Sequence, residues 1–285
     1  TLSQKLAEGA AGRVYRGLYR NQDVGVKIIK NEMEQRQMQD FMKEFTILAT
    51  LRSPQVVYFY GICLEPELAM VMEFCSNGSV YDVLNRKDII FDWPLFMRMA
   101  VDMCRGLLSL HSWKPQIVHR DVKSLNFLVD VNWVTKVSDF GLSRHATSKR
   151  STLEKVRGTY AYSAPEVYYG QSYTSKSDVY SFAIILWELV ERLIVGKYSS
   201  PYKEYDYIKF DFQILIQTSK KNLRPTLPIG CPSHLQSIIA SSWHPDPDKR
   251  PEAVELLSVL QALEKESRDD SRTWNVVVHD LREME

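Results

Sequence analysis

The first third of the chain alternates and clusters β-forming residues in short runs. The runs "RVYRGLYR" and "DVGVKIIK" flank a polar "NQD" turn, which predicts a β-hairpin. The runs "QVVYFYGIC" and "LAMVMEF" predict two further strands around an "EPE" turn. Between these two pairs, the apolar residues Phe41, Phe45, Leu48 and Ala49 recur at the spacing of one helix face. The pattern therefore predicts a small, strand-rich part with one helix.

After the stretch "CSNGS" the apolar pattern takes the period of helices. One helix is predicted over residues 92–111, with Asp92 as its N-cap and Pro94 in its first turn. Its apolar face consists of Phe96, Met99, Ala100, Met103, Leu107 and Leu110. Further helices are predicted around residues 177–192, 234–243 and 252–266.

These patterns predict an α+β fold with two lobes. We expect a small lobe, an antiparallel β-sheet with one helix, over residues 1–75 and a short linker over residues 76–79. A larger, mainly helical lobe follows over residues 80–266, and residues 267–285 form a tail. In such an architecture a binding site is expected in a cleft between the lobes.

Composition and charge exclude several classes of function. The 285 residues are 45% hydrophobic and 25% charged with a net charge of +1, so the chain can bury a large core but has no excess charge for nucleic acid or an anionic membrane. The longest apolar run, "FAIILWELV", is too short for membrane insertion and is predicted to be a buried helix.

The cysteine pattern and the start of the chain indicate the cellular compartment and the domain context that we expect. The four cysteines lie far apart without a Cys-x-x-Cys pair, which argues against a zinc site and indicates free thiols in a reducing, cytoplasmic compartment. No signal peptide opens the chain. Because it begins without methionine and almost at its first motif, we expect a domain from a longer protein with flanking domains.

Two segments of the predicted small lobe have features that suit phosphate binding. In "EGAAGRVY", Gly9 and Gly12 lie in a turn between strands, where backbone amides can approach phosphate oxygens closely, although two glycines in a hairpin more often serve only the turn. Lys27, in the apolar strand "VGVKII", could extend outward to solvent. Alternatively it reaches a phosphate, with Glu44 as its carboxylate partner.

Two segments of the larger lobe carry short acidic and amide side chains. In "HRDVKSLNFLVD", Asp121 can accept a proton from a hydroxyl, Asn126 can ligate a hard cation, and Lys123 can neutralise phosphate charge. In "KVSDFGLSR", Asp139 follows a predicted strand, a suitable place for a metal-binding carboxylate. Together these groups match the needs of phosphoryl transfer, which depends on positioning, charge neutralisation and an oriented hydroxyl.

From about Leu6 to Leu263 the chain resembles the eukaryotic protein kinases, because these motifs occur in the family's order and spacing. The resemblance implies a bilobal kinase fold, ATP and Mg²⁺ (or Mn²⁺) as cofactors, and proteins as substrates. For the nucleotide, it implies that Gly9 and Gly12 cover the phosphates and that Lys27 contacts them while pairing with Glu44. It further implies an adenine site formed by Val14, by Met72 as gatekeeper, and by the backbone of Glu73 and Cys75.

For the reaction, the resemblance implies that Asp121 is the catalytic base, that Lys123 steadies the γ-phosphate, and that Asn126 and Asp139 bind the metal. It also implies structural roles. Glu166 in "SAPE" should pair with Arg250, and Asp178 should anchor the catalytic loop from a buried helix. The expected hydrophobic spine consists of Leu48, Phe59, His119 and Phe140, so His119 is structural in this interpretation.

The subgroup and acceptor are predicted from local detail. Lys123, two residues after the base, and Thr159 resemble serine/threonine kinases, while "MEFCSNGSVYDVL" and "SDVYSFAIILWEL" resemble the tyrosine-kinase-like group, close to Raf-like and mixed-lineage kinases. We predict a serine/threonine kinase of that group. Dual specificity, tyrosine-directed activity and a pseudokinase-type binding module stay open, although the full set of catalytic residues favours an active enzyme. The segment "GTYAYSAPE" argues against a small-molecule kinase.

The segment between Asp139 and Glu166 is predicted to be a phosphorylation switch. Its hydroxyl residues are Thr147, Ser148, Ser151 and Thr152. Arg120 and Arg144 are the expected receivers of the phosphate, since arginine binds phosphate through two parallel hydrogen bonds.

Two stretches depart from the family pattern. Ala7 and Ala11 replace a glycine and an aromatic residue of the phosphate loop, for which we expect a modest effect. Residues 196–212 are longer than the usual link between two helices, and we expect a packed or solvated insertion there rather than a docking surface.

Overall fold

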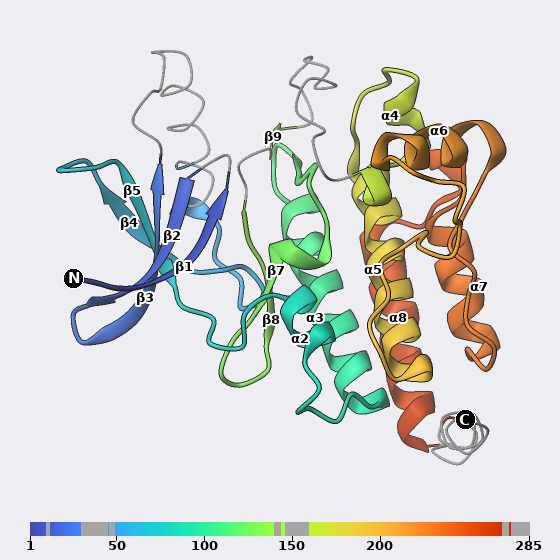
Figure 1. The fold of residues 1–285 in the computed structure, drawn as a ribbon, viewed down its shortest axis with the longest axis horizontal. Helices are drawn as coiled ribbons and strands as arrows, with labels where there is room; N and C mark the ends of the chain where they lie inside the picture. Colours follow the sequence, from blue (N-terminus) through green and yellow to red (C-terminus); the bar gives the residue numbers. More distant parts are fainter. Residues whose placement is uncertain are drawn as a thin grey trace.

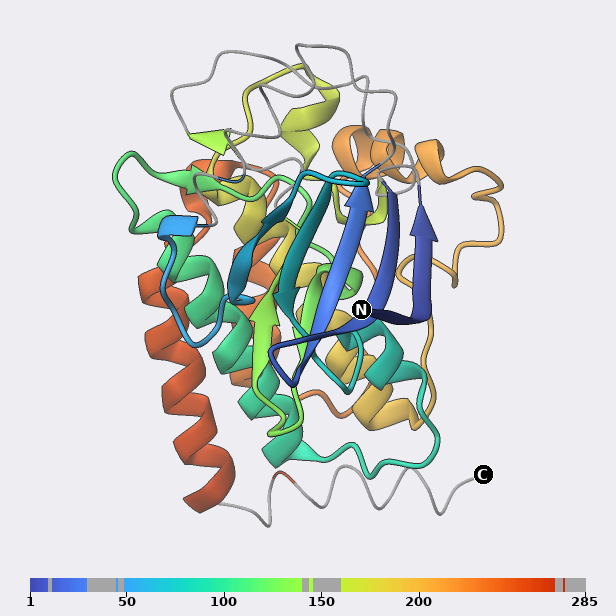
Figure 2. The same cartoon turned by 90° about the vertical axis from the view of Figure 1, so that its left-hand side faces the viewer.

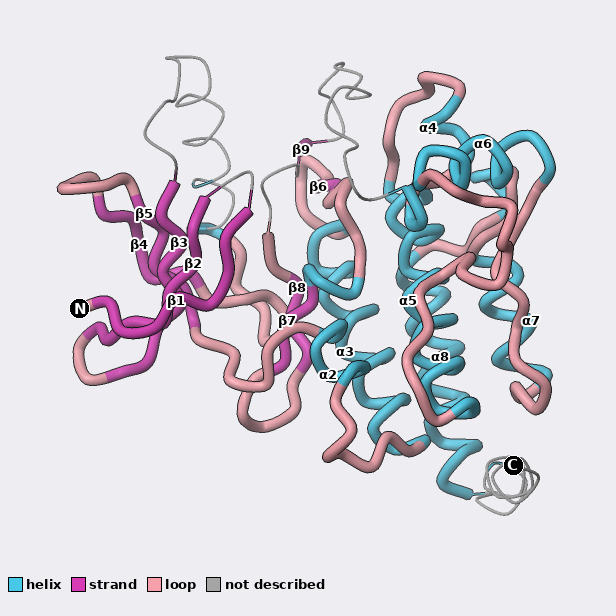
Figure 3. The backbone as a smooth tube through the Cα atoms, viewed as in Figure 1, coloured by secondary structure: helices cyan, strands magenta, loops and turns pink. Residues whose placement is uncertain are grey.

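The computed structural model describes residues 1–9, 12–29, 45, 49–139, 144–145, 160–269 and 274. The large sheet lies in one part of the molecule, and the helices with a few short strands lie in the other, as Figure 3 shows. The sheet of the first part has five antiparallel strands in the order β1-β2-β3-β5-β4 (Figure 1). The predicted bilobal α+β fold is confirmed.

The predicted hairpin is formed by β2 (Gly12–Tyr19) and β3 (Gln22–Ile29), and β1 (Leu2–Gly9) pairs with β2 on the other side. Its turn lies at Arg20 and Asn21, one residue earlier than the "NQD" motif indicates. Both residues have positive φ angles, 49° and 61°, which characterise the tight turns whose twist matches that of paired strands.

The third predicted strand is shorter than its sequence pattern. β4 covers only Phe59–Cys63, and it pairs with β5 (Ala69–Glu73). Residues 55–57 instead bond to β8 (Thr135–Val137) beyond the sheet: the Val57 amide donates to the Val137 carbonyl at 3.0 Å. These β-forming residues thus connect the two parts of the molecule rather than extend the sheet.

The helix predicted after β3 lies mostly outside the described residues. Phe45 and Ala49 are helical, and Phe45 packs edge-on against Phe59 with ring centroids 5.1 Å apart. Leu48, and with it a member of the expected hydrophobic spine, lies outside the description, as does Phe140.

The second part of the molecule contains the predicted helices, seen from two sides in Figures 1 and 2. Its α-helices are α2 (Val80–Asn85), α3 (Trp93–His111), α4 (Pro165–Tyr168), α5 (Ser175–Val195), α6 (Asp211–Lys221), α7 (Ser233–Ser242) and α8 (Ala253–Asp269). Its short strands and 3₁₀ turns are β6 (Ile117–Val118), β7 (Phe127–Val129), β8, β9 (Arg144–His145), η1 (Ser124–Asn126), η4 (Tyr160–Tyr162) and η5 (Pro247–Lys249).

Helix α3 forms as its sequence predicts. Asp92 is its N-cap and accepts a hydrogen bond from the Leu95 amide at 3.0 Å. The predicted apolar face is completely buried: Phe96, Met99, Ala100, Met103, Leu107 and Leu110. Helix α3 packs against α5, α8 and β8, so it lies within the core of the larger lobe.

Helix α5 is the centre of the core. The run "FAIILWELV" is buried on all sides within it, as predicted. A capping box at Thr174 and Ser177 begins the helix, and Gly196 ends it in a left-handed conformation with φ 80°. Among the described residues, no helix has the length and apolarity needed to cross a membrane.

One residue of the tail returns to the folded lobe. Trp274 is buried and stands edge-on to Trp93, with ring centroids 4.7 Å apart. The Trp93 indole nitrogen donates to the Trp274 carbonyl at 2.7 Å. The tail is therefore anchored on the N-terminal end of α3 at this position.

Residues 196–212 form a packed insertion, as expected. Tyr202 is 2% exposed, and the Tyr205 hydroxyl donates to the Arg224 carbonyl at 2.7 Å. The Tyr198 hydroxyl reaches Glu188 in the core helix at 2.8 Å. Tyr207 is the exception among these tyrosines, because 57% of it is exposed.

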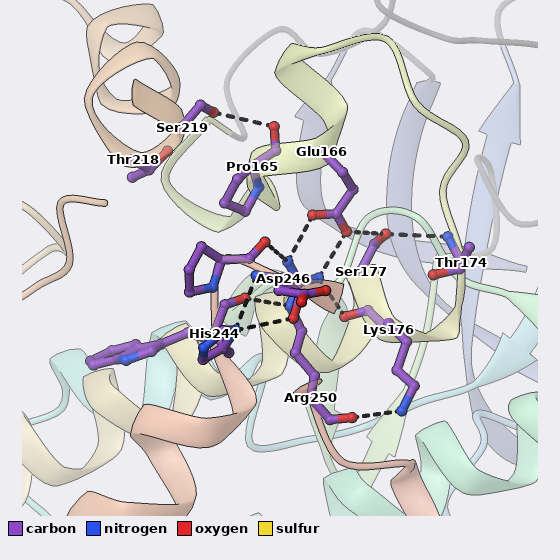
Figure 4. Close-up of polar contacts among 12 residues, drawn as sticks. Pro165, Glu166, Thr174, Lys176, Ser177, Thr218, Ser219, His244, Asp246 and Arg250 are labelled. Atoms are coloured by element: carbon purple, nitrogen blue, oxygen red, sulfur yellow. Dashed lines mark hydrogen bonds and ion pairs between the residues drawn. The ribbon is translucent and has the colours of Figure 1, made fainter. Parts of the chain in front are cut away.

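A buried ion pair fixes α4 to the residue that follows η5 (Figure 4). Arg250 binds Glu166 through two nitrogens, at 2.8 and 2.7 Å, and Ser177 of α5 donates to the same carboxylate at 2.7 Å. Burial is the largest single effect and would raise the pKa of Glu166, but the hydrogen bonds and charge of Arg250, together with the bond from Ser177 and a backbone bond, hold the pKa below its ordinary value. The predicted Glu166–Arg250 pair is confirmed.

The substitution Arg250→Met should lower the free energy of unfolding by about 3–5 kcal/mol, because it leaves the Glu166 carboxylate buried without its cation. Urea unfolding measures the change. The neighbouring exposed cation provides a matched control, and Lys249→Met should have an effect within about 0.5 kcal/mol. Equal effects of the two substitutions would contradict this account.

Candidate active site

The loop that carries Asp121 is fixed to α5 by hydrogen bonds to the Asp178 carboxylate. The Asp178 carboxylate is 1% exposed and accepts hydrogen bonds from the amides of His119 and Arg120, at 2.8 and 2.9 Å. His111 lies 2.9 Å from the same carboxylate. Arg120 has a φ of 70°, a strained conformation for a non-glycine residue that these bonds help to maintain.

His119 is a structural residue, as predicted. It is completely buried, and its Nε2 lies 2.8 Å from the Ser138 carbonyl, to which it donates. Its Nδ1 accepts a bond from the Asp121 amide at 3.3 Å. Both ring nitrogens therefore form hydrogen bonds, which connect the loop of Asp121 to the residue that follows β8.

Three of the predicted catalytic residues meet in one cluster. Lys123 Nζ lies 2.7 Å from Asp121 Oδ2, and Asn126 Nδ2 donates to the same oxygen at 2.9 Å. Asn126 also donates to the Asp121 carbonyl at 2.7 Å. Asn126 lies in η1 and is 5% exposed, so the Asp121 side chain is held by a rigid turn rather than a loose loop.

Two further predicted residues meet between the lobes. Lys27 Nζ of β3 lies 2.7 Å from Asp139 Oδ1, and Asp139 follows β8 with a φ of 53°. The lysine side chain is 14% exposed and the aspartate 43%. Glu44, the predicted partner of Lys27, lies outside the described residues. The Lys27–Asp139 ion pair thus connects the small lobe to the predicted metal-binding residue of the large lobe.

The predicted nucleotide residues Gly9, Gly12, Val14, Lys27, Met72 and Glu73 lie on strands of the sheet, and Cys75 follows β5. Gly9 pairs with Gly12 at the tip of the β1–β2 hairpin. Val14 of β2 pairs with Lys27 of β3. Gly12 has a φ of 152°, and a Cβ there would lie 2.1 Å from the Ile28 carbonyl oxygen. This glycine is therefore required by the sheet itself, whatever its approach to phosphate.

Comparison with known proteins decides the family. Residues 1–260 match the family model described as protein tyrosine and serine/threonine kinase. The chain belongs to the protein kinase family. It is 50% identical over 97% of its length to stress-activated protein kinase alpha and 42% identical over 97% to ankyrin repeat-containing protein kinase A, both of Dictyostelium discoideum. It spans 43% and 19% of those two proteins, and a third relative, 49% identical, is named a probable serine/threonine-protein kinase.

The junction of this kinase domain contains an ion pair that the sequence did not indicate. Met72 is half-buried and Cys75 is 7% exposed, and between them Glu73 ends β5. Its Oε2 accepts from the Tyr58 amide at 3.1 Å, and its Oε1 pairs with Lys136 of β8. Only the backbone of Glu73 was predicted to have a role, but its side chain links the two lobes.

Asn126 and Asp139 fit the predicted metal site by their donor chemistry. Because the Asn126 amide nitrogen already donates to Asp121, its oxygen is the atom left to ligate a cation. A carboxylate oxygen and an amide oxygen suit Mg²⁺, which commonly takes one or two protein ligands and completes its shell with phosphate and water.

A buried acid beneath the loop is a second feature that the sequence did not reveal. Glu188 of α5 is completely buried, and its Oε1 accepts from Tyr198 (2.8 Å), Tyr162 (2.9 Å) and Ser124 (3.1 Å). Burial raises the pKa of Glu188 to about 7, although these hydroxyl bonds oppose the rise. Ser124 lies three residues after Asp121, so Glu188 joins the catalytic loop to the segment that contains Tyr162.

The predicted phosphorylation sites Thr147, Ser148, Ser151 and Thr152 lie outside the described residues. Arg144 lies in β9, where its backbone pairs with Val118 of β6, two residues before Arg120. The Arg120 guanidinium lies over the Tyr173 ring, 5.2 Å from its centroid. The backbone therefore brings the two arginine positions into the same region.

Glu188 predicts a pH dependence of stability. Because its folded-state pKa of about 7 exceeds its ordinary value of 4.5, its stabilising contribution is complete below pH 4.5 and is lost as the pH rises through about 7. Glu188→Gln does not titrate, so wild type should lose stability relative to this variant between pH 5 and pH 8, by up to about 3 kcal/mol. Urea unfolding at several pH values measures the difference, and a constant difference would contradict the assignment.

Proposed function

We propose that this domain transfers the γ-phosphate of ATP to serine or threonine hydroxyls of proteins, with Mg²⁺ or Mn²⁺ as the metal. The observation that carries the proposal is the joint placement of two groups of residues. Asp121, Lys123 and Asn126 form one cluster, and Lys27 meets Asp139 between the lobes. The serine/threonine kinase names of similar proteins support the class of acceptor.

In this mechanism Asp121 orients the acceptor hydroxyl. Lys123 and Asn126 both bond to its Oδ2, so Oδ1 is the oxygen that accepts the hydroxyl proton. Lys123, 2.7 Å from the carboxylate, is placed to stabilise the charge of the transferring group as well. The hydrogen bonds from Asn126 of η1 hold Asp121 in place, which would position a bound acceptor hydroxyl for in-line attack.

Lys27 and Asp139 hold the other reactant. Lys27 would contact the α- and β-phosphates, and its ion pair with Asp139 connects the two lobes. The metal, held by Asn126 and Asp139, neutralises charge on the phosphates when bound. Gly9 and Gly12 would cover the phosphates, while Val14, Met72 and the backbone of Glu73 and Cys75 would bind the adenine.

We further assign the domain to the tyrosine-kinase-like group, supported by the motifs around residues 72–84 and 177–189. Dual specificity or a tyrosine acceptor is the alternative, to be decided by the identity of the modified residue. Relatives that extend well beyond the matched region support flanking domains, and we propose a cytoplasmic protein with protein substrates.

Asp121→Asn should reduce phosphoryl transfer roughly 100- to 10,000-fold and leave nucleotide binding near the wild-type level, because the amide cannot accept the hydroxyl proton. Transfer from labelled ATP to a mixture of serine, threonine and tyrosine peptides measures the first effect, and calorimetry with Mg²⁺–ATP the second. The exposed Asp88→Asn is the matched control and should be fully active. Full transfer by Asp121→Asn would contradict its assignment as the base.

We also propose that phosphorylation between Asp139 and Glu166 activates the domain through Arg120 and Arg144. A variant with alanine at residues 147, 148, 151 and 152 should then lose the activation that autophosphorylation or an upstream kinase produces, while Ser258→Ala, at an exposed site of α8, should retain it. Turnover before and after phosphorylation is the measurement, and equal activation of both variants would refute the switch.

A further inference from the structure

We propose that Leu125, Tyr81 and Tyr198 form an apolar subsite that binds an apolar side chain of the substrate close to the acceptor hydroxyl. The subsite deepens the proposed function and rests on it, because it presupposes that Asp121 acts on a hydroxyl of a polypeptide. The three residues are called the apolar ledge below.

Leu125 is the first observation. It lies in η1 between Ser124 and Asn126, which are 0% and 5% exposed and bond inward to Glu188 and Asp121. Leu125 itself is 51% exposed, so its side chain is directed away from the core. A large apolar side chain is thus presented to the surface one residue from Asn126, within the loop that carries the predicted base.

The two tyrosines supply an ordered aromatic surface beside it. Helix α2, which contains Tyr81, packs against η1. Tyr81 is 36% exposed and stands edge-on to Tyr198, with ring centroids 5.3 Å apart. The Tyr198 hydroxyl and Ser124 Oγ both bond to Glu188 Oε1, at 2.8 and 3.1 Å. One buried oxygen therefore fixes the Tyr198 ring relative to the residue that precedes Leu125.

The charges around the apolar ledge favour an apolar rather than a basic occupant. Glu188 is completely buried and saturated at Oε1 by three hydroxyls, so it offers no exposed carboxylate. The Asp82 carboxylate of α2 is used by its own helix cap, accepting from the Ser79 amide at 2.8 Å and the Ser79 hydroxyl at 2.7 Å. Lys123, with its side chain 20% exposed, is paired with Asp121 at 2.7 Å, so this pair offers no net charge to attract a charged substrate residue.

The occupant is the substrate polypeptide itself, because the apolar ledge is continuous with the loop on which Asp121 lies. Burying an apolar side chain there gains binding free energy by removing apolar surface from water, and the preordered rings lose little entropy. A single apolar subsite of this kind typically discriminates by about 10- to 200-fold, so its effect on substrate choice should be measurable.

The test uses serine-acceptor peptides in which each position flanking the serine is varied in turn. Wild type should prefer leucine, phenylalanine or methionine over lysine and aspartate at one position by about tenfold. Leu125→Glu should abolish that preference through a higher KM and favour lysine at the same position. Leu125→Ala, at an exposed site, should weaken the preference without a charge reversal. Ile90→Glu, which changes another exposed apolar residue, should alter neither.

The outcomes separate the subsite from the proposed function. An active wild-type domain with no apolar preference at any flanking position, or a preference that Leu125→Glu and Leu125→Ala leave unchanged, would overturn the subsite alone. A wild-type domain that phosphorylates no peptide or protein would overturn the proposed function and the subsite with it. An apolar preference of the wild type that Leu125→Glu and Leu125→Ala weaken, and that Ile90→Glu leaves unchanged, would establish it.

Discussion

The hydrogen bonds that the backbone amides of His119 and Arg120 donate to Asp178 are the interaction on which the candidate site depends. A buried carboxylate must be satisfied by donors, and here backbone amides at 2.8 and 2.9 Å satisfy it. These bonds fix the loop against α5 and hold Arg120 at a φ of 70°. Asp121, the next residue, is thereby directed to the side where Lys123 and Asn126 bind it.

Helix α5 fixes neighbouring segments through further hydrogen bonds of its buried polar side chains. Ser177 bonds to Glu166, Ser181 bonds to the Tyr162 carbonyl at 2.7 Å, and Glu188 collects hydroxyls from three segments. An otherwise apolar helix thus uses a few polar side chains to hold the catalytic loop and the segment before α4. Buried polar groups of this kind specify one geometry, because each alternative leaves an unsatisfied donor or acceptor. Transfer chemistry depends on positioning, and a rigid central helix supplies it.

Local periodicity was enough to predict α3, α5, α7, α8 and the β2–β3 hairpin, because burial of one face leaves its signature in neighbouring residues. The motifs predicted Asp121, Lys123 and Asn126, whose contacts are close in sequence. The Glu73–Lys136 and Glu188–Tyr198 contacts were missed, since nothing local distinguishes an acid that pairs across the fold from one that is solvated. Residues 55–57 were assigned to the sheet because β-forming residues do not reveal which partner they bond.

The most direct measurement of the central claim is single-turnover phosphoryl transfer by Asp178→Asn. The side-chain amide can accept from one of the two backbone amides but presents an N–H group to the other, so the loop should shift without loss of the fold. We expect transfer to a serine peptide to fall by on the order of 100-fold while Mg²⁺–ATP affinity stays close to wild type and the variant remains folded at the assay temperature. Transfer at the wild-type rate by a folded Asp178→Asn variant would contradict the account.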